Sequence, residues 1–76
     1  MNKYIISKPN IMGGTPVVKG TRIPIEVLLH RLKEGNSIDK IHQMYNWIDK
    51  KVIAGAIEEA IQTLLTTLNG KKILQA

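Results

Sequence analysis

The residues best suited to chemistry lie in the segment Lys19-Gly20-Thr21-Arg22. Its glycine favours a tight turn with a positive φ, which would bring the flanking side chains together at one end of a hairpin. Lysine, threonine and arginine side chains at such a turn can contact the phosphates or a groove of DNA. They also have a structural interpretation, in which Arg22 pairs with Glu26 and Thr21 caps the turn. The sequence leaves both interpretations open.

A second pair of cations, Lys50 and Lys51, follows Asp49 at the expected start of the longest helix. The helix dipole disfavours cations there, so a DNA phosphate as partner would account for them, and so would an ordinary solvated face. The other polar side chains expected on the outer face of this helix are Glu58, Glu59 and Gln62. Bases are read mostly by arginine, asparagine and glutamine, so base reading by this helix has weak support. We interpret Glu58 and Glu59 as a solvated face.

Residue sets for catalysis or metal binding are missing from the sequence. It has no cysteine, and its two histidines, His30 and His42, lack the spacing of a metal-binding motif. It contains no Ser-His-Asp set, no phosphate-binding loop and no paired carboxylates, and we interpret Gly13-Gly14 as part of a turn. We therefore expect neither an enzyme nor a protein with a metal or cofactor.

Charge and composition indicate an anionic partner. The 76 residues carry a formal net charge of +5. Residues 1–35 contain six basic and two acidic residues, and residues 36–76 contain five and four, so the positive charge lies mainly in the N-terminal part. The few aromatic residues argue against platforms that stack single-stranded bases. No apolar run is long enough to span a bilayer and residues 1–20 lack the apolar region of a signal peptide, so we expect a soluble cytoplasmic protein.

A β ribbon is expected to carry the first group of cations. Residues 1–24 hold all three prolines and three of the six glycines, with short β-rich pieces between these breakers. We predict three extended pieces, at residues 4–6, 17–18 and 21–23. The turn at Gly20 would fold the second piece back against the third.

Three helices are expected to follow the ribbon, over residues 24–34, about 38–45 and 50–68. Ser37 and Asp49 suit the N-caps of the second and third helices, and Gly35 suits the end of the first. Asn69-Gly70 should end the third helix, because both residue types tolerate a left-handed backbone.

This order predicts a single, mainly α domain, with a helix-turn-helix core over residues 24–69, the ribbon over 1–24 and a tail over 70–76. In such a core the third helix offers its first turns to the major groove. Tyr45 and Trp47 are expected to wedge the turn between the second and third helices rather than stack on bases.

An apolar stripe marks the C-terminal part of the third helix. Ile61, Leu64, Leu65 and Leu68 share one face and extend roughly 12 Å beyond the reach of a short second helix, at 1.5 Å per residue. An exposed apolar stripe marks an interface. We expect it to contact a second copy or another protein; the alternative is that the ribbon folds over it.

The ten residues from Gly14 to Ile23, reading Gly-Thr-Pro-Val-Val-Lys-Gly-Thr-Arg-Ile, resemble a known pattern. They are similar to the hallmark of the DUF433 family of small prokaryotic proteins, Gly-x-Pro-x-[Ile/Val]-[Lys/Arg]-Gly-Thr-Arg-[Ile/Val] followed by a helix that ends in glycine. The resemblance covers about residues 3–65. Members usually have Tyr-Pro at the turn before the third helix, whereas here Tyr45 precedes Asn46, a residue that also tolerates turns.

The resemblance implies a homeodomain-like three-helix fold with an N-terminal β arm, and an antitoxin that binds a PIN-like (DUF5615-type) toxin and operator DNA. We predict an antitoxin-type DNA-binding protein that neutralises a PIN-like toxin and autoregulates its operon as a homodimer on double-stranded DNA. If DNA is bound, the ribbon should contribute as much as the third helix, because the charge is concentrated there. The alternative is a protein-interaction module that docks a partner through the stripe, with little specific DNA binding.

Overall fold

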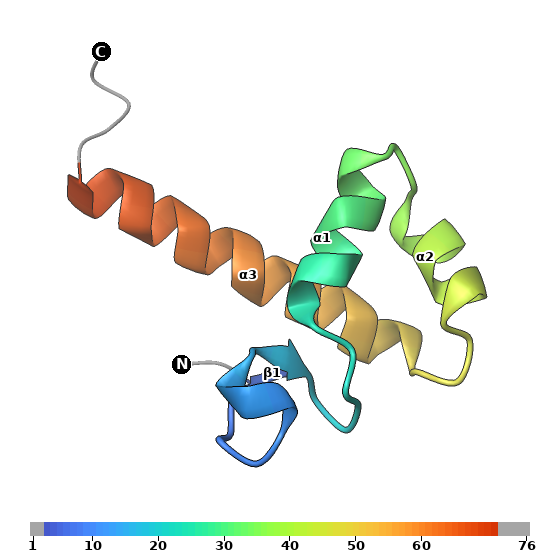
Figure 1. The fold of residues 1–76 in the computed structure, drawn as a ribbon. Coiled ribbons are helices and arrows are strands. Elements are labelled where there is room, and N and C mark those ends of the chain that lie inside the picture. The colour runs from blue at the N-terminus through green and yellow to red at the C-terminus, as the bar shows by residue number, and fades with distance from the viewer. Residues whose placement is uncertain (1–2, 72–76) are drawn as a thin grey trace.

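Three helices pack together above a small N-terminal ribbon in the computed structural model, which describes residues 3–71. In chain order the elements are β1 (Ile5–Ile6), the 3-10 turn η1 (Met12–Gly14), β2 (Val17–Val18), α1 (Ile25–Lys33), α2 (Ile38–Met44) and α3 (Lys50–Lys71). Figure 1 shows α1 crossing α3, with α2 on the outer side of α1 and the ribbon beneath them. The predicted fold class, mainly α with a helix-turn-helix-like core and a short β ribbon, is confirmed.

The first two helices begin and end where their capping residues predict. Gly35 follows α1 with a φ of 98°, and the Gly35 N–H donates to the Leu32 carbonyl at 2.9 Å. The Asn36 N–H donates to the Arg31 carbonyl at 3.1 Å, which completes a Schellman motif. At the start of α2 the Ser37 hydroxyl accepts the Lys40 N–H at 3.1 Å. Local capping chemistry therefore sets the turn between α1 and α2.

The third helix starts as predicted but continues past its predicted end. The Asp49 carboxylate accepts the Lys51 N–H at 2.8 Å and caps the first turn. At the other end α3 runs through Asn69 and Gly70 to Lys71, so the prediction that Asn69-Gly70 ends the helix is wrong. These residue types permit a left-handed ending without imposing one. The rest of the predicted tail, residues 72–76, lies outside the described residues.

Replacing the cap of α3 should have a measurable cost. Asp49→Ala is expected to lower the free energy of unfolding by about 1 kcal/mol, because the Lys51 N–H loses its acceptor. Urea denaturation followed by circular dichroism measures this change. Asn46→Ala is the control, because the exposed Asn46 side chain in the same turn makes no hydrogen bond within residues 3–71. Equal stability of the two variants would contradict the capping role.

The ribbon is a two-stranded antiparallel sheet rather than three extended pieces. Ile5 pairs with Val18 and Ile6 pairs with Val17. The predicted fold-back at Gly20 is present, since φ is 78° there and the Val18 N–H donates to the Ile23 carbonyl at 2.9 Å. Residues 21–23 nevertheless form no strand, because the chain bends there and pairs with β2 only through a Val17–Pro24 bridge.

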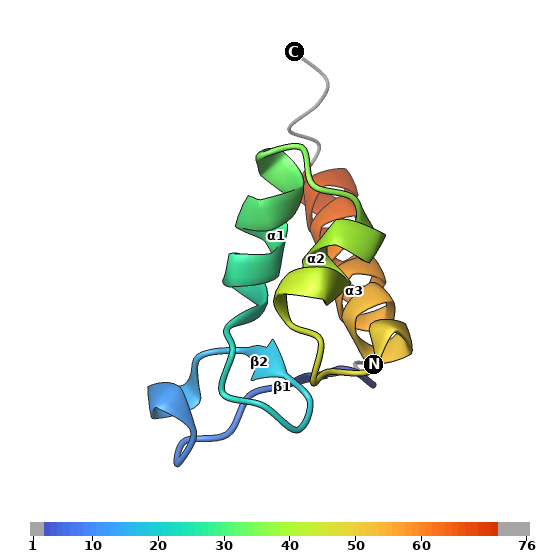
Figure 2. The ribbon, with the colours of Figure 1, turned by 90° about the vertical axis from the view of Figure 1, so that its right-hand side faces the viewer.

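The core joins every helix to the second strand. Its buried members are Val18, Leu28, Ile41, Ile48, Ile53, Ala56 and Ile57. In Figure 2 the ribbon lies across the lower ends of α1 and α3, where Val18 enters this core. The Tyr4 ring packs against α3 at Gly55, so closely that a Cβ built on Gly55 would lie 2.2 Å from a ring carbon. The ribbon is thus part of the packed structure, which fixes the backbone positions from which its cations extend.

Candidate functional site

The ribbon presents a basic surface with no acidic residue in its sequence. Residues 1–24 contain four cations and neither aspartate nor glutamate. The four side chains, Lys3, Lys8, Lys19 and Arg22, are all exposed. None of them forms an ion pair within residues 3–71. The positive charge of this surface is therefore free to act on a partner.

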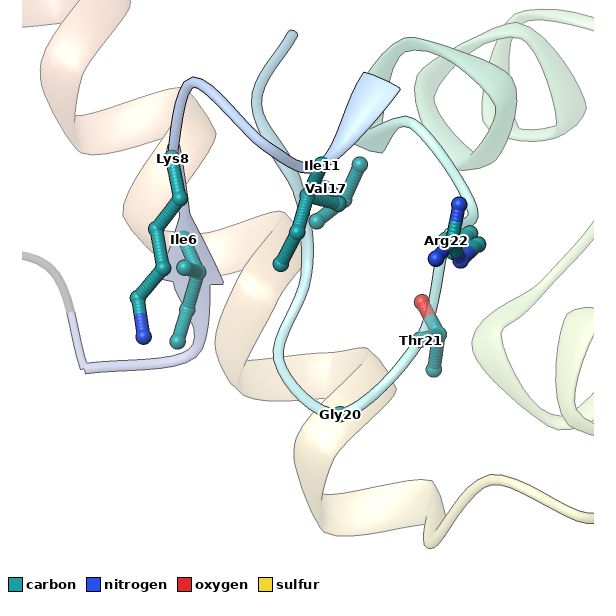
Figure 3. A pocket seen from close by; sticks show the side chains of 7 residues that line it. All are labelled: Ile6, Lys8, Ile11, Val17, Gly20, Thr21 and Arg22. Atoms are coloured by element: carbon teal, nitrogen blue, oxygen red, sulfur yellow. The ribbon is translucent and has the colours of Figure 1, made fainter. Parts of the chain in front are cut away.

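A depression of about 490 Å³ opens on this surface. Its lining residues are Ile6, Lys8, Ile11, Val17, Gly20, Thr21 and Arg22. Figure 3 shows Lys8 on one side and Arg22 with Thr21 on the other, with Ile11 and Val17 between them. The fold thus brings Lys8, which the sequence analysis did not single out, to the same surface as Arg22.

The side chains that flank Gly20 differ in whether they make contacts within the protein. The Thr21 hydroxyl donates to the Val18 carbonyl at 2.8 Å and accepts the Ile23 N–H at 3.0 Å, which confirms the structural interpretation of Thr21. The ion pair between Arg22 and Glu26 that the structural interpretation offered does not form, and the exposed Arg22 side chain lies at the depression instead. Lys19 is exposed, and its backbone N–H donates to the Tyr4 carbonyl at 2.9 Å. Lys19 and Arg22 are thus the cations that this turn offers to a partner.

The two lysines at the start of α3 also differ: within residues 3–71 one forms an ion pair and the other does not. The Lys50 ammonium pairs with the Asp39 carboxylate of α2, which lowers the pKa of Asp39 below its ordinary value. The stabilisation from this pair is present above the ordinary pKa of aspartate and disappears as the pH falls through the lowered one. Lys51 is exposed and forms no ion pair within residues 3–71. Lys51 is therefore the better placed of the two for an outside phosphate.

Glu59 does not belong to a solvated face, so that interpretation was wrong for this residue. Its carboxylate accepts the backbone N–H of Lys3 at 2.8 Å and that of Tyr4 at 2.9 Å. Two backbone donors hold the carboxylate in place, and the side chain is half-buried. Glu58, by contrast, is exposed as expected. Glu59 therefore fixes the start of the ribbon to α3, and its negative charge stays beside that part of the ribbon.

The apolar stripe on the C-terminal part of α3 is exposed. The exposed fractions are 43% for Ile61, 56% for Leu64 and 47% for Leu65, while Leu68 is half-buried. The ribbon contacts α3 earlier, through Gly55 and Glu59. The alternative in which the ribbon covers the stripe is therefore wrong for these three residues.

The turn between α2 and α3 contains two aromatic residues, of which one packs against the core and the other is mostly exposed. Tyr45 packs against the core, and the Arg31 Nε donates to its hydroxyl at 3.4 Å. Trp47 stands edge-on to Tyr45 with ring centroids 5.7 Å apart, and 68% of it is exposed. Tyr45 thus wedges the turn as predicted, whereas Trp47 does not, because most of its side chain is exposed.

Among residues 3–71, no group of three or more histidine, aspartate or glutamate side chains could hold a metal ion. No helix in that range is long and apolar enough to cross a membrane.

Comparison with known proteins identifies relatives at the level of family and fold. A family model described as "Protein of unknown function (DUF433)" matches residues 5–60. The "Uncharacterized protein y4eO" of Sinorhizobium fredii (strain NBRC 101917 / NGR234) is 35% identical over 51 residues, which are 67% of this chain and 23% of that protein. The chain therefore spans about a quarter of the length of this relative.

A solved structure shares the fold. The crystal structure of a DUF433 member protein from Anabaena variabilis ATCC 29413 superposes with a TM-score of 0.68 at 21% sequence identity. The match covers 83% of this chain and 62% of the other. At this identity the match establishes the shared fold.

Proposed function

The chain belongs to the DUF433 family, and we propose that it is an antitoxin-type regulator that binds double-stranded DNA of its own operon as a homodimer. The observation that carries the proposal is the ribbon, whose sequence has no acidic residue and whose four cations are exposed and form no ion pair within residues 3–71. Such a surface suits the phosphate backbone, whose contacts dominate DNA affinity. The helix-turn-helix-like core beside it supplies a second contact at Lys51.

Phosphate contacts are a better account of this surface than base reading by α3. The outer face of α3 near its start combines Lys51 with the exposed carboxylate of Glu58, and Lys50 is held by Asp39. A carboxylate on that face disfavours close approach to DNA, since phosphates carry the same charge. We therefore propose that the ribbon carries at least as much of the DNA affinity as α3.

The toxin partner belongs to the same proposal. By its resemblance to antitoxins, we propose that the chain neutralises a PIN-like (DUF5615-type) nuclease. A second candidate function, a protein-interaction module with little specific DNA binding, is favoured by the exposed stripe at Ile61, Leu64 and Leu65.

Salt-dependent DNA binding distinguishes the two candidates. Fluorescence anisotropy with a duplex from the protein's own promoter, and a scrambled duplex as control, is measured at about 50 mM and 200 mM salt. If the four ribbon cations each neutralise one phosphate, affinity is expected to fall roughly 100-fold over this range. Preference for the promoter duplex would support a repressor. Equal binding to both duplexes, or none, would favour the protein-interaction module.

A further inference from the structure

The C-terminal half of α3 has an unusual composition for an exposed helix. Residues 60–70 contain no aspartate, glutamate, lysine or arginine. Residues 61–67 are all exposed. In Figure 1 this orange-to-red part of α3 extends beyond α1 and away from the ribbon, with no other described element beside it. Neutral exposed helix is uncommon on a solvated face and is typical of the centre of an interface, where charged residues are depleted.

The apolar side chains of this segment form one continuous stripe. Ile61, Leu64, Leu65 and Leu68 follow the spacing i, i+3, i+4 and i+7, which places them along one face of a helix. The remaining positions carry alanine, glutamine, threonine, asparagine and glycine, none of which is charged. The stripe therefore offers apolar contact without an electrostatic preference of its own.

The distribution of charge favours a second copy of this chain as the occupant. Two copies each carry a net charge of +5, and most of it lies in the ribbon, which contacts α3 at Gly55 and Glu59, before the stripe begins. Contact through the uncharged residues 60–70 brings no like charges directly together at the stripe, so it costs little repulsion. An acidic partner, by contrast, would be drawn to the ribbon rather than to the stripe.

We infer that two copies pair through Ile61, Leu64, Leu65 and Leu68 in an antiparallel contact related by a two-fold axis. The antiparallel arrangement places the two ribbons at opposite ends of the pair, whereas a parallel one would bring them side by side. The axis passes near Leu64 and Leu65, so that Ile61 of one copy lies opposite Leu68 of the other. This inference rests on the proposed function, because it assigns the surface through which the proposed dimer forms. Its test involves no DNA, so the inference and the proposed DNA binding can fail separately.

The dimer should be weak, because the stripe is short. Stable protein interfaces bury about 1,200–2,000 Å² in total, and four side chains on one helix per copy supply less. We therefore expect a dissociation constant in the micromolar range. The mass in solution should rise from one chain towards two as concentration increases.

Sedimentation of the full chain from about 1 μM to 1 mM tests the pairing, a range that brackets a micromolar dissociation constant. The double variant Leu64→Lys with Leu65→Lys adds like charges at the axis and is expected to weaken association at least 10-fold. The matched control is Gln62→Lys with Thr66→Lys, which adds the same charge on a different face of α3 and should dimerise like the wild type. A wild-type chain that stays monomeric, or a stripe variant that dimerises like the control, would overturn the inference.

Thermal unfolding and crosslinking separate this arrangement from its rivals. Leu64 and Leu65 are exposed, so their replacement should leave the melting temperature of the monomer unchanged; a marked drop would mean that the chain covers its own stripe. Because the sequence has no cysteine, single cysteines report on geometry. Ile61→Cys mixed with Leu68→Cys should give the mixed disulfide, and preferential self-crosslinking of each variant would establish a parallel pair instead.

Discussion

Gly55→Ala is expected to lower the free energy of unfolding by about 2 kcal/mol, although alanine is the better helix former. In the interior of α3 the substitution alone would gain about 1 kcal/mol of helix propensity. The added Cβ, however, would lie 2.2, 2.5 and 2.9 Å from three carbons of the Tyr4 ring. These are body atoms of the ring rather than a flexible tip, so the whole side chain must leave α3. Overpacking of this kind costs about 1–3 kcal/mol, and displacement of the ribbon adds to it.

The test is a double-mutant cycle with Tyr4→Ala, followed by thermal and urea denaturation. In the background that keeps Tyr4, Gly55→Ala should lower the melting temperature by about 8–16 °C for a domain of this size. In the Tyr4→Ala background the ring is absent, and the same substitution should stabilise by about 1 kcal/mol. This reversal of sign is specific to the ring contact. A destabilisation of the same size in both backgrounds would contradict it.

Removing two cations from the ribbon is expected to have the second large effect, on DNA binding. Lys19→Ala combined with Arg22→Ala should lower the affinity for the promoter duplex about 10- to 100-fold near 50 mM salt. Each lost phosphate contact should also make the negative slope of log affinity against log salt shallower by about 0.9, which is about two for the pair. Both side chains are exposed and unpaired within residues 3–71, so the fold should tolerate their removal.

A charge-matched variant makes this prediction specific to the ribbon. Lys33→Ala with Lys40→Ala removes the same charge near the turn between α1 and α2, at the far end of α1 from the ribbon (Figure 2). It should reduce affinity only slightly through the weaker overall field. If the two double variants lose affinity equally, the ribbon has no special role. Unchanged affinity and slope after loss of Lys19 and Arg22 would show that the ribbon does not touch DNA.

The helices could be predicted from the sequence because their limits are decided locally. Ser37 and Asp49 accept N–H groups two or three residues ahead, and Gly35 closes α1 with a bond that reaches back three residues. Such short-range chemistry can be read directly from residue types. The exposed stripe on α3 was predictable for a related reason, since a short α2 cannot reach that far.

The ribbon and its anchor could be predicted only in part, because their contacts join distant residues. The strand pairing of Ile5 with Val18 spans thirteen positions, and Glu59 binds Lys3 at a separation of 56. Nothing in the local sequence around Glu59 distinguishes it from Glu58. A signal did exist in Gly55, because a glycine inside an apolar helical period indicates close approach of another group.

The cations that are candidates for DNA contact show the same limit of prediction from sequence, here for residues about ten positions apart. The sequence placed Lys50 and Lys51 together at the start of a helix, yet the fold pairs Lys50 with Asp39 on α2 and leaves Lys51 exposed. Lys8 reaches the surface of Arg22 through the pairing of the two strands. Counting charge by segment would have found Lys8, since residues 1–24 contain no acid at all.

The bonds from Glu59 to the start of the chain also set the order in which the protein can finish folding. The N-terminal residues leave the ribosome first, but their acceptor on α3 is synthesised more than fifty residues later. During translation the ribbon therefore has no surface on which to dock, and its closure must be a late event. Long-range closure of this kind is slow relative to helix formation. A nascent chain interrupted before Glu59 would lack the acceptor that holds the start of the basic ribbon against α3.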